Sequence, residues 1–264
     1  MPQNVLTTIT EGIARIVLNR PESYNALDGA LMDEFVESVT RLAVDDSVRA
    51  VIITGAGKAF CSGGDLKYMH QESPDAPGDV TYRLAATFHK AIIEIRRMSK
   101  PVIAAINGPA AGAGMSIALA CDFRVMAQSA IFRQAFSTWG LSMDGSGTFS
   151  LPRLVGLARA LEIVAFDEPI PATKALEWGM VTRVVDDAHV VDEAEAMART
   201  LAARSLHAFG QAKRLMTDSF NTPLEVQLER ERASVSACAN HSDGREGIRA
   251  FVEKRRPVFP DNRQ

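Results

Sequence analysis

The stretch Lys100-Pro-Val-Ile-Ala-Ala-Ile-Asn-Gly-Pro-Ala-Ala-Gly-Ala-Gly114 decides the fold of this chain. Its apolar residues 102–106 predict a buried strand, which runs through a glycine-rich turn into a short apolar segment, 114–121. No residue from Pro101 to Cys121 is charged, and that length approaches a membrane span. Because glycines, prolines and polar residues interrupt the stretch, a strand, a tight turn and a buried helix explain it better.

A second stretch repeats this arrangement earlier in the chain. The apolar residues 48–54 predict another buried strand, and Lys58-Ala-Phe-Cys-Ser-Gly-Gly-Asp65 follows it as a glycine-rich turn. Small residues at such turns let the backbone approach a ligand closely and leave N–H groups free. Two turns can present two donors to one oxygen, which stabilises charge developing on a carbonyl. Two ordinary strand-to-helix turns are the alternative, and composition alone does not separate the two interpretations.

The remaining pattern predicts an α/β protein. Strands at 5–10 and 13–19 are expected to form a hairpin through Glu11-Gly12. Helical spacing predicts helices at 27–42 and 84–95, and helices dominate after Leu151-Pro152, beginning with 153–165. We expect an α/β core at residues 1–200 and a helical C-terminal region at 201–264. Residues 71–80 are expected to form a loop, either part of a pocket wall or plain surface.

Composition excludes several classes of function. The 264 residues carry 29 Lys plus Arg and 32 Asp plus Glu, so no positive excess favours nucleic acid as a partner. The three cysteines are far apart and the five histidines are scattered, which predicts no disulfide framework and no metal site. A dinucleotide motif is not expected, because Gly112-Ala-Gly114-Met-Ser-Ile117 lacks the third glycine. Without a secretory signal or a membrane partner, the protein is expected to be cytoplasmic.

The two glycine-rich turns resemble the two signature segments of the crotonase (enoyl-CoA hydratase/isomerase) superfamily. Further resemblances follow in family order: Leu18-Asn-Arg-Pro-Glu22, Asn25-Ala-Leu27, Leu151-Pro-Arg-Leu-Val-Gly156, Glu177-Trp-Gly-Met-Val181 and Arg245-Glu-Gly-Ile-Arg-Ala-Phe-Val-Glu-Lys254. The resemblance implies a crotonase-like spiral of repeated ββα units with a helical C-terminal trimerisation region, forming a homotrimer or a dimer of trimers. It also implies an acyl-CoA thioester as ligand, with CoA as part of the substrate and no separate cofactor.

The same resemblance assigns candidate site residues by position. It implies that the backbone N–H groups of Ser62 and Ala113 form an oxyanion hole, where one donor is typically worth about 3–4 kcal/mol of barrier. Phe251 and Lys254 match residues that reach CoA from a neighbouring subunit, although the basic run 254–256 equally suits a helix C-terminus. The residues implied to bind substrate or CoA within the subunit are Asn25, Ala26, Leu27, Ala59, Ser62, Gly63, Gly64, Asp65, Leu66, Gly112 and Phe136.

The catalytic carboxylates implied for the family's hydratases are absent. Their two glutamates would fall at Ser116 and Phe136, and neither replacement can shuttle a proton. Asp144, within Gly140-Leu-Ser-Met-Asp-Gly-Ser-Gly-Thr148, is from the residues alone an N-cap or turn residue. Its surroundings, however, resemble the family's ring 1,2-epoxyphenylacetyl-CoA isomerases, which implies that Asp144 is the catalytic acid/base. A single carboxylate can move a proton between two carbons, so we expect an acyl-CoA isomerase.

Two other functions are also consistent with the sequence. The family's 4-chlorobenzoyl-CoA dehalogenases place an aspartate at Asp144 and a histidine at His89, which implies nucleophilic attack followed by water activation. The tryptophan of those enzymes would fall at Phe136, and a lone helical histidine is also commonly structural or exposed. The third possibility is a non-catalytic subunit that binds acyl-CoA. The sequence does not determine the acyl group.

Overall fold

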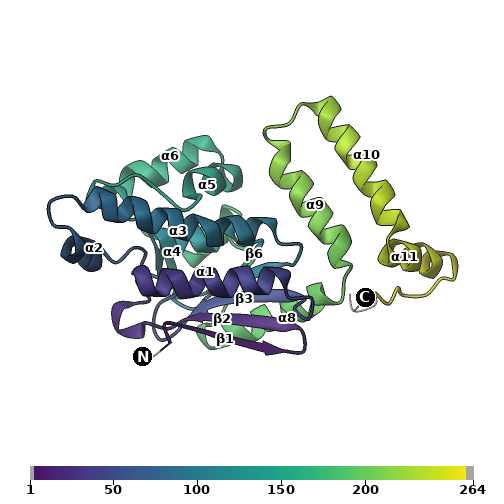
Figure 1. The fold of residues 1–264 in the computed structure, drawn as a ribbon, viewed down its shortest axis with the longest axis horizontal. Coiled ribbons are helices and arrows are strands. Elements are labelled where there is room, and N and C mark those ends of the chain that lie inside the picture. The colour runs from purple at the N-terminus through teal and green to yellow at the C-terminus, as the bar shows by residue number, and fades with distance from the viewer. Residues whose placement is uncertain (1–2, 260–264) are drawn as a thin grey trace.

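A six-stranded sheet forms the centre of the molecule in the computed structural model, which describes residues 3–259 (Figure 1). Its strand order is β1-β2-β3-β4-β6-β9, antiparallel between β1 and β2 and parallel elsewhere. The predicted hairpin turn at Glu11 and Gly12 is confirmed. The strands are β1 (Val5–Thr10), β2 (Ile13–Leu18), β3 (Ala50–Gly55), β4 (Val102–Ile106), β6 (Phe123–Ala127) and β9 (Arg183–Val185).

A second, three-stranded sheet lies next to the glycine-rich turns. Its order is β5-β7-β8, and its strands are β5 (Ala110–Ala111), β7 (Ile131–Arg133) and β8 (Ile170–Pro171). Cys61 pairs with Ala110 through an isolated parallel bridge, so the first turn is joined to the edge of this sheet. The two turns that the sequence singles out are therefore adjacent in the fold.

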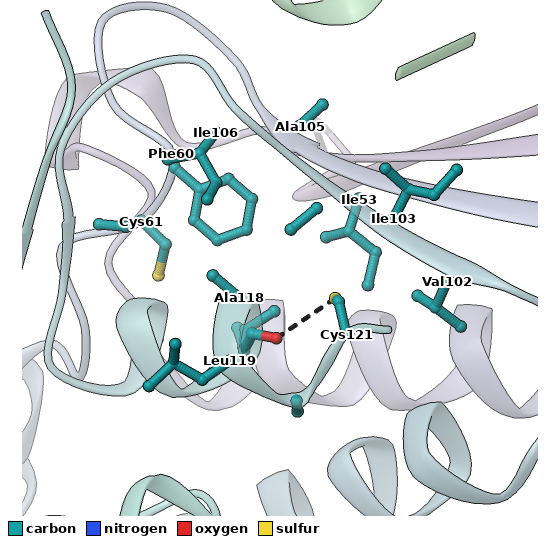
Figure 2. Packing of buried hydrophobic residues seen from close by; sticks show 14 of the residues in the cluster. Ile53, Phe60, Cys61, Val102, Ile103, Ala105, Ile106, Ala118, Leu119 and Cys121 are labelled. Atoms are coloured by element: carbon teal, nitrogen blue, oxygen red, sulfur yellow. Dashed lines mark hydrogen bonds between the residues drawn. The ribbon is translucent and has the colours of Figure 1, made fainter. Parts of the chain in front are cut away.

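Helices cover both faces of the large sheet. Every residue of β3 and β4 is buried, as expected for parallel strands with both faces covered. Helices α1 (Gly29–Val44) and α3 (Pro77–Arg97) lie side by side (Figure 1), while α8 (Val190–Ala202) packs across β2, β3, β4 and β6. The predicted buried helix is α4 (Ala113–Ala120), and all its residues are buried. Figure 2 shows its Ala118 facing the core beside Phe60 and Ile53.

Two helix boundaries differ from the prediction. The loop expected at 71–80 is confirmed only at residues 73–76. Residues 71–72 belong to the end of α2 (Leu66–Glu72), and residues 77–80 form the start of α3. Proline suits the first position of a helix, where its missing N–H costs nothing, and the exposed first turns of α3 carry little apolar periodicity. The single helix expected at 153–165 is instead α5 (Gly147–Val155) and α6 (Leu157–Phe166), which are separated at Gly156.

The remaining helices include α7 (Ala172–Glu177) and a C-terminal group: α9 (Leu206–Ser219), α10 (Leu224–Asn240) and α11 (Ser242–Val252). Helix α9 contacts α3, α10 packs on α9, and α11 packs on α10. Figure 1 shows α10 and α11 projecting away from the sheets. Short 3-10 turns lie at Pro21–Ser23, Ser137–Trp139 and Asp187–His189. None of the helices among residues 3–259 is long and apolar enough to cross a membrane.

A buried ion pair fastens α9 to the core. The Lys213 ammonium donates to the Asp122 carboxylate at 2.7 Å and to the Ile95 carbonyl at 2.8 Å. The two charged side chains are only 6% and 9% exposed. Burial therefore raises the pKa of Asp122 and lowers the pKa of Lys213. Removing either side chain would therefore leave the other as a buried charge without its partner.

Replacing Lys213→Met is expected to lower the free energy of unfolding by about 3–5 kcal/mol, because the Asp122 carboxylate would lose its buried cation. Urea denaturation followed by circular dichroism measures this loss. The matched control is Arg232→Met, which breaks the exposed pair with Glu229 at 2.7 Å and should change stability little. Equal losses in the two variants would contradict the anchoring role of Lys213.

Candidate active site

The two glycine-rich turns are in direct backbone contact. The Ala111 amide donates to the Cys61 carbonyl at 2.9 Å, and the Cys61 amide donates to the Pro109 carbonyl at 3.3 Å. A Cβ atom added to Gly114 would lie 2.2 Å from the Cys61 carbonyl oxygen. Only glycine permits this approach, so the start of α4 is seated on the first turn with no side chain between them.

Backbone pairing determines which amides remain free, and it corrects one prediction. The Ser62 amide donates to the Tyr24 carbonyl at 3.0 Å, so it is not available as an oxyanion donor. Leu27 pairs with residues on either side of Gly64: its amide donates to the Gly63 carbonyl at 2.8 Å, and its carbonyl accepts from the Asp65 amide at 3.0 Å. The intervening Gly64 amide therefore points away from Leu27.

The free donors are the amides of Gly64 and Ala113. Neither has a hydrogen-bond acceptor within the described residues 3–259. For Ala113 the reason is its place at the first position of α4, where a helical amide has no partner in its own helix. For Gly64 the reason is the pairing of Leu27. Both residues line the same cavity.

This cavity has a volume of about 550 Å³, which is within the usual range for small-molecule sites. Its walls come from α1, α2, α3, the two turns and residues 135–144, and most of them are apolar. Of the predicted site residues, the cavity is lined by Ser62, Gly63, Gly64, Leu66, Gly112, Ala113, Phe136 and Asp144. It is not lined by Asn25, Ala26, Leu27, Ala59, Asp65, His89, Phe251 or Lys254.

Asp144 lies in the turn before α5 and faces His89 from α3. Asp144 Oδ1 and His89 Nε2 are 2.7 Å apart, and the two side chains are 38% and 48% exposed. The N-cap position of α5 belongs to Ser146, so the N-cap interpretation of Asp144 is wrong. The turn interpretation is confirmed, since the Asp144 carbonyl accepts from the Gly147 amide at 3.2 Å. Asp144 also lines the cavity, with an imidazole within hydrogen-bonding distance of its carboxylate.

Asp144 is the sole carboxylate among the lining residues that the structure describes. Ser116, at the position implied for the first hydratase glutamate, is buried in α4, and its hydroxyl donates to the Asp144 carbonyl at 2.6 Å. Phe136, at the position implied for the second, lines the cavity. Within the first turn, burial raises the pKa of Cys61 to about 12, which keeps its thiol neutral and unsuited to nucleophilic attack.

Two residues in the segments whose backbone is implied to line the CoA site, Asn25 and Asp65, use their side chains to hold the fold. The buried Asn25 amide donates to the Ala59 carbonyl at 2.8 Å and to the Phe60 carbonyl at 3.2 Å. The Asp65 carboxylate accepts from the Tyr68 amide and caps α2. An aspartate immediately before an apolar-periodic segment is a recognised helix-start signal, so the role of Asp65 was readable from the sequence.

Arg20 links the two helix starts that flank the first turn. Its Nη1 lies 3.2 Å from the Asp65 carboxylate and 3.1 Å from that of Asp28, which caps α1. The same atom donates to the Ala26 carbonyl at 2.6 Å. One guanidinium thus fixes both capping carboxylates, a structural role that spacing along the chain did not reveal.

Phe251 and Lys254 lie far along the chain, at the end of α11 and just beyond it. The Phe251 side chain is 85% exposed. Within the single described chain, neither residue is brought to the cavity.

Comparison with known proteins places this architecture in a family. Residues 8–262 match the family described as enoyl-CoA hydratase/isomerase. The chain is 35% identical over 259 residues to the 1,2-epoxyphenylacetyl-CoA isomerase of Escherichia coli, covering 98% of this chain and 99% of that protein. It is 37% identical over 249 residues to 4-chlorobenzoyl coenzyme A dehalogenase-1 of Arthrobacter, covering 93% of this chain and 89% of that protein.

A solved structure agrees with these similarities. The crystal structure of an enoyl-CoA hydratase from Polaromonas superposes with a TM-score of 0.92 at 37% identity, covering 97% of this chain and 99% of that chain. The chain belongs to the enoyl-CoA hydratase/isomerase family, and its predicted α/β fold of crotonase type is confirmed. The names of these relatives include an isomerase, a dehalogenase and a hydratase, so family membership leaves the reaction type open.

The contact between the turns yields a stability prediction. Gly114→Ala is expected to lower the free energy of unfolding by about 1–3 kcal/mol or more, because the new Cβ would lie 2.2 Å from the Cys61 carbonyl. Thermal unfolding is the measurement. Gly78→Ala in α3 is the control, since its Cβ would meet nothing within 4 Å and alanine favours helix. A Gly114→Ala protein as stable as wild type would contradict this seating of α4.

Proposed function

We propose that the protein is an acyl-CoA isomerase that moves a proton on an enoyl- or aromatic-ring-derived CoA thioester. One observation carries the proposal: a single carboxylate, Asp144, lines a mostly apolar cavity that also contains the free amides of Gly64 and Ala113. A pair of amides suits a thioester oxygen, and one carboxylate suits a proton shuttle. The second acid that hydration employs has no counterpart in this wall.

The two amides supply the electrostatic part of the reaction. In the proposed complex the N–H groups of Gly64 and Ala113 donate to the thioester oxygen, which becomes negative as the enolate forms. Removal of one such donor typically costs about 3–4 kcal/mol of transition-state stabilisation. The amide of Ala113 also lies at the N-terminus of α4, where the helix dipole favours negative charge. Apolar walls strengthen both interactions by excluding water.

Asp144 supplies the proton transfer. The carboxylate accepts a proton from one carbon of the acyl group, and the electron pair of the broken C–H bond delocalises onto the held carbonyl oxygen as an enolate. When the enolate collapses, the proton returns from the carboxylate to another carbon, and the double bond lies in its new position. No water is consumed, so the product has the mass of the substrate. A His89 N–H donating to the carboxylate at 2.7 Å would orient it toward the cavity.

The contact between His89 and Asp144 also supports a second candidate. In a dehalogenase-like reaction, Asp144 would attack an activated aromatic carbon and expel halide, and His89 would activate water to hydrolyse the resulting aryl ester. Two of the required side chains are 2.7 Å apart, and a dehalogenase is among the similar proteins. Phe136 at the position implied for a tryptophan weighs against this reaction, so we rank it second.

We also propose a homotrimer or a dimer of trimers. Phe251, 85% exposed on α11, is remote from the cavity of its own chain, and apolar side chains such as Val235 and Val252 are 67% and 74% exposed. These surfaces suit burial against another copy. On this proposal Phe251 and Lys254 reach the CoA of a neighbouring subunit. Light scattering coupled to size-exclusion chromatography tests the oligomeric state.

Asp144→Asn is expected to lower kcat by at least 10²–10⁴-fold, the usual contribution of a general acid/base, and to leave acyl-CoA binding nearly unchanged. Turnover is followed by chromatography of the CoA esters, and binding by calorimetry. Asp79→Asn, an exposed aspartate in the first turn of α3, is the matched control. Wild-type turnover in Asp144→Asn would reject the assignment. Binding without turnover by the unaltered protein, on every ester tried, would indicate a non-catalytic subunit.

The reaction type is distinguished by incubation in ¹⁸O-water with 3-enoyl-, 2-enoyl-, aromatic-ring and 4-chlorobenzoyl-CoA esters. We expect a mass-neutral product from an enoyl or ring-derived ester and no incorporation of heavy oxygen. Oxygen incorporation would instead mean hydration or hydrolysis. Halide release, with an aryl ester accumulating on His89→Ala protein in the mass spectrum, would establish the dehalogenase-like reaction.

A further inference from the structure

One buried hydroxyl group lies behind the wall of the active site. Ser116 is fully buried and carries the single polar side chain of α4, whose sequence is Ala-Gly-Met-Ser-Ile-Ala-Leu-Ala. A buried hydroxyl is costly unless it finds a hydrogen-bond partner. A helical serine usually bonds a carbonyl in its own preceding turn, but Ser116 Oγ donates across to the Asp144 carbonyl at 2.6 Å.

The segment that Ser116 holds is a turn in an unfavourable backbone conformation. Gly145 and Ser146 follow Asp144 with φ values of +64° and +67°, and the second of these is rare for a residue with a side chain. A Cβ added to Gly145 would lie 2.3 Å from Phe88 Cε1 and 3.1 Å from Ser116 Cβ. The turn is therefore wedged between α3 and α4.

The position of Ser116 along α4 connects the two parts of the proposed catalytic apparatus. Ser116 follows Ala113 by less than one helical turn, and Ala113 contributes one of the free amides. On the proposed function, α4 thus presents the Ala113 amide to the thioester oxygen, and through Ser116 it also hydrogen-bonds the backbone of the acid/base Asp144. A shift of the Asp144 turn relative to α4 would change the distance between the proton acceptor and the held carbonyl.

We propose that Ser116 is a positioning residue that sets Asp144 at its working distance from the amides of Gly64 and Ala113. The inference rests on the proposed acid/base role of Asp144. Ser116 does not line the cavity, so it acts through the Asp144 backbone and touches no substrate. Its loss should therefore slow the chemical step without weakening the binding of the ester.

The test compares Ser116→Ala with wild type in two measurements. We expect kcat to fall between about 10- and 100-fold, as for a reacting group misplaced by about 1 Å, while KM stays within about twofold. Hydrogen–deuterium exchange should accelerate in residues 141–149, because the turn loses its link to α4. The matched control is Ser38→Ala on α1, which removes a buried hydroxyl that accepts from the Thr7 hydroxyl on β1 and should leave kcat unchanged.

The outcomes separate this inference from the proposed function. Wild-type kcat in Ser116→Ala, or a lower kcat without faster exchange at 141–149, would overturn the positioning role even if Asp144→Asn is inactive. Full turnover in Asp144→Asn would overturn the proposed function, whatever the exchange of the turn. Should alanine prevent folding, Ser116→Cys keeps a similar volume with a weaker donor, and the same loss of kcat without loss of binding is expected there.

Discussion

The contact between the Cys61 carbonyl and the start of α4 is the constraint on which the site depends. It brings two backbone segments about 50 residues apart in the chain within hydrogen-bonding distance, with the Ala111 amide donating to the Cys61 carbonyl at 2.9 Å. Side chains can change rotamer, but these groups cannot move without breaking the packing of α4 against β3 and β4 (Figure 2). On the proposed function, the unpaired amides of Gly64 and Ala113, which line the same cavity, would donate to one thioester oxygen.

The elements that build this contact were predictable because their signals are local. An apolar run with no charge from Pro101 to Cys121 indicated β4 and α4, and the same logic located β3. Which amide is free was not predictable in this way. The Ser62 amide donates to the Tyr24 carbonyl, whereas the Gly64 amide has no acceptor because Leu27 pairs with the residues on either side of it. Both contacts are made by a segment about 40 residues earlier in the chain. Successive amides of an extended segment point to opposite sides, and composition does not reveal which of them meets a carbonyl of that distant segment.

The roles of side chains were also predictable only in part. The family resemblance implied Asn25 and Asp65 as binding residues. The Asn25 side chain donates to backbone carbonyls, and the Asp65 carboxylate accepts from the Tyr68 amide and pairs with Arg20. A family motif contains residues that stabilise the fold as well as residues that bind the ligand, and their spacing in the sequence does not distinguish the two kinds. The local sequence indicated a turn at Asp144 but not its contact with His89 on α3, because the position of the turn comes from packing against Phe88 and Ser116.

The reaction depends on how many proton-handling groups this scaffold retains. Relatives with different reactions in their names share 35–37% identity with this chain over nearly its whole length, so the fold alone does not select the chemistry. Addition of water needs a group that holds and deprotonates the water and another that protonates carbon. At the two implied positions this chain has a hydroxyl turned toward backbone and an aromatic ring. On the proposed assignment, both hydratase carboxylates are missing, and the serine at the first of their positions holds the backbone of a carboxylate at a third position, Asp144, which acts alone as the proton shuttle.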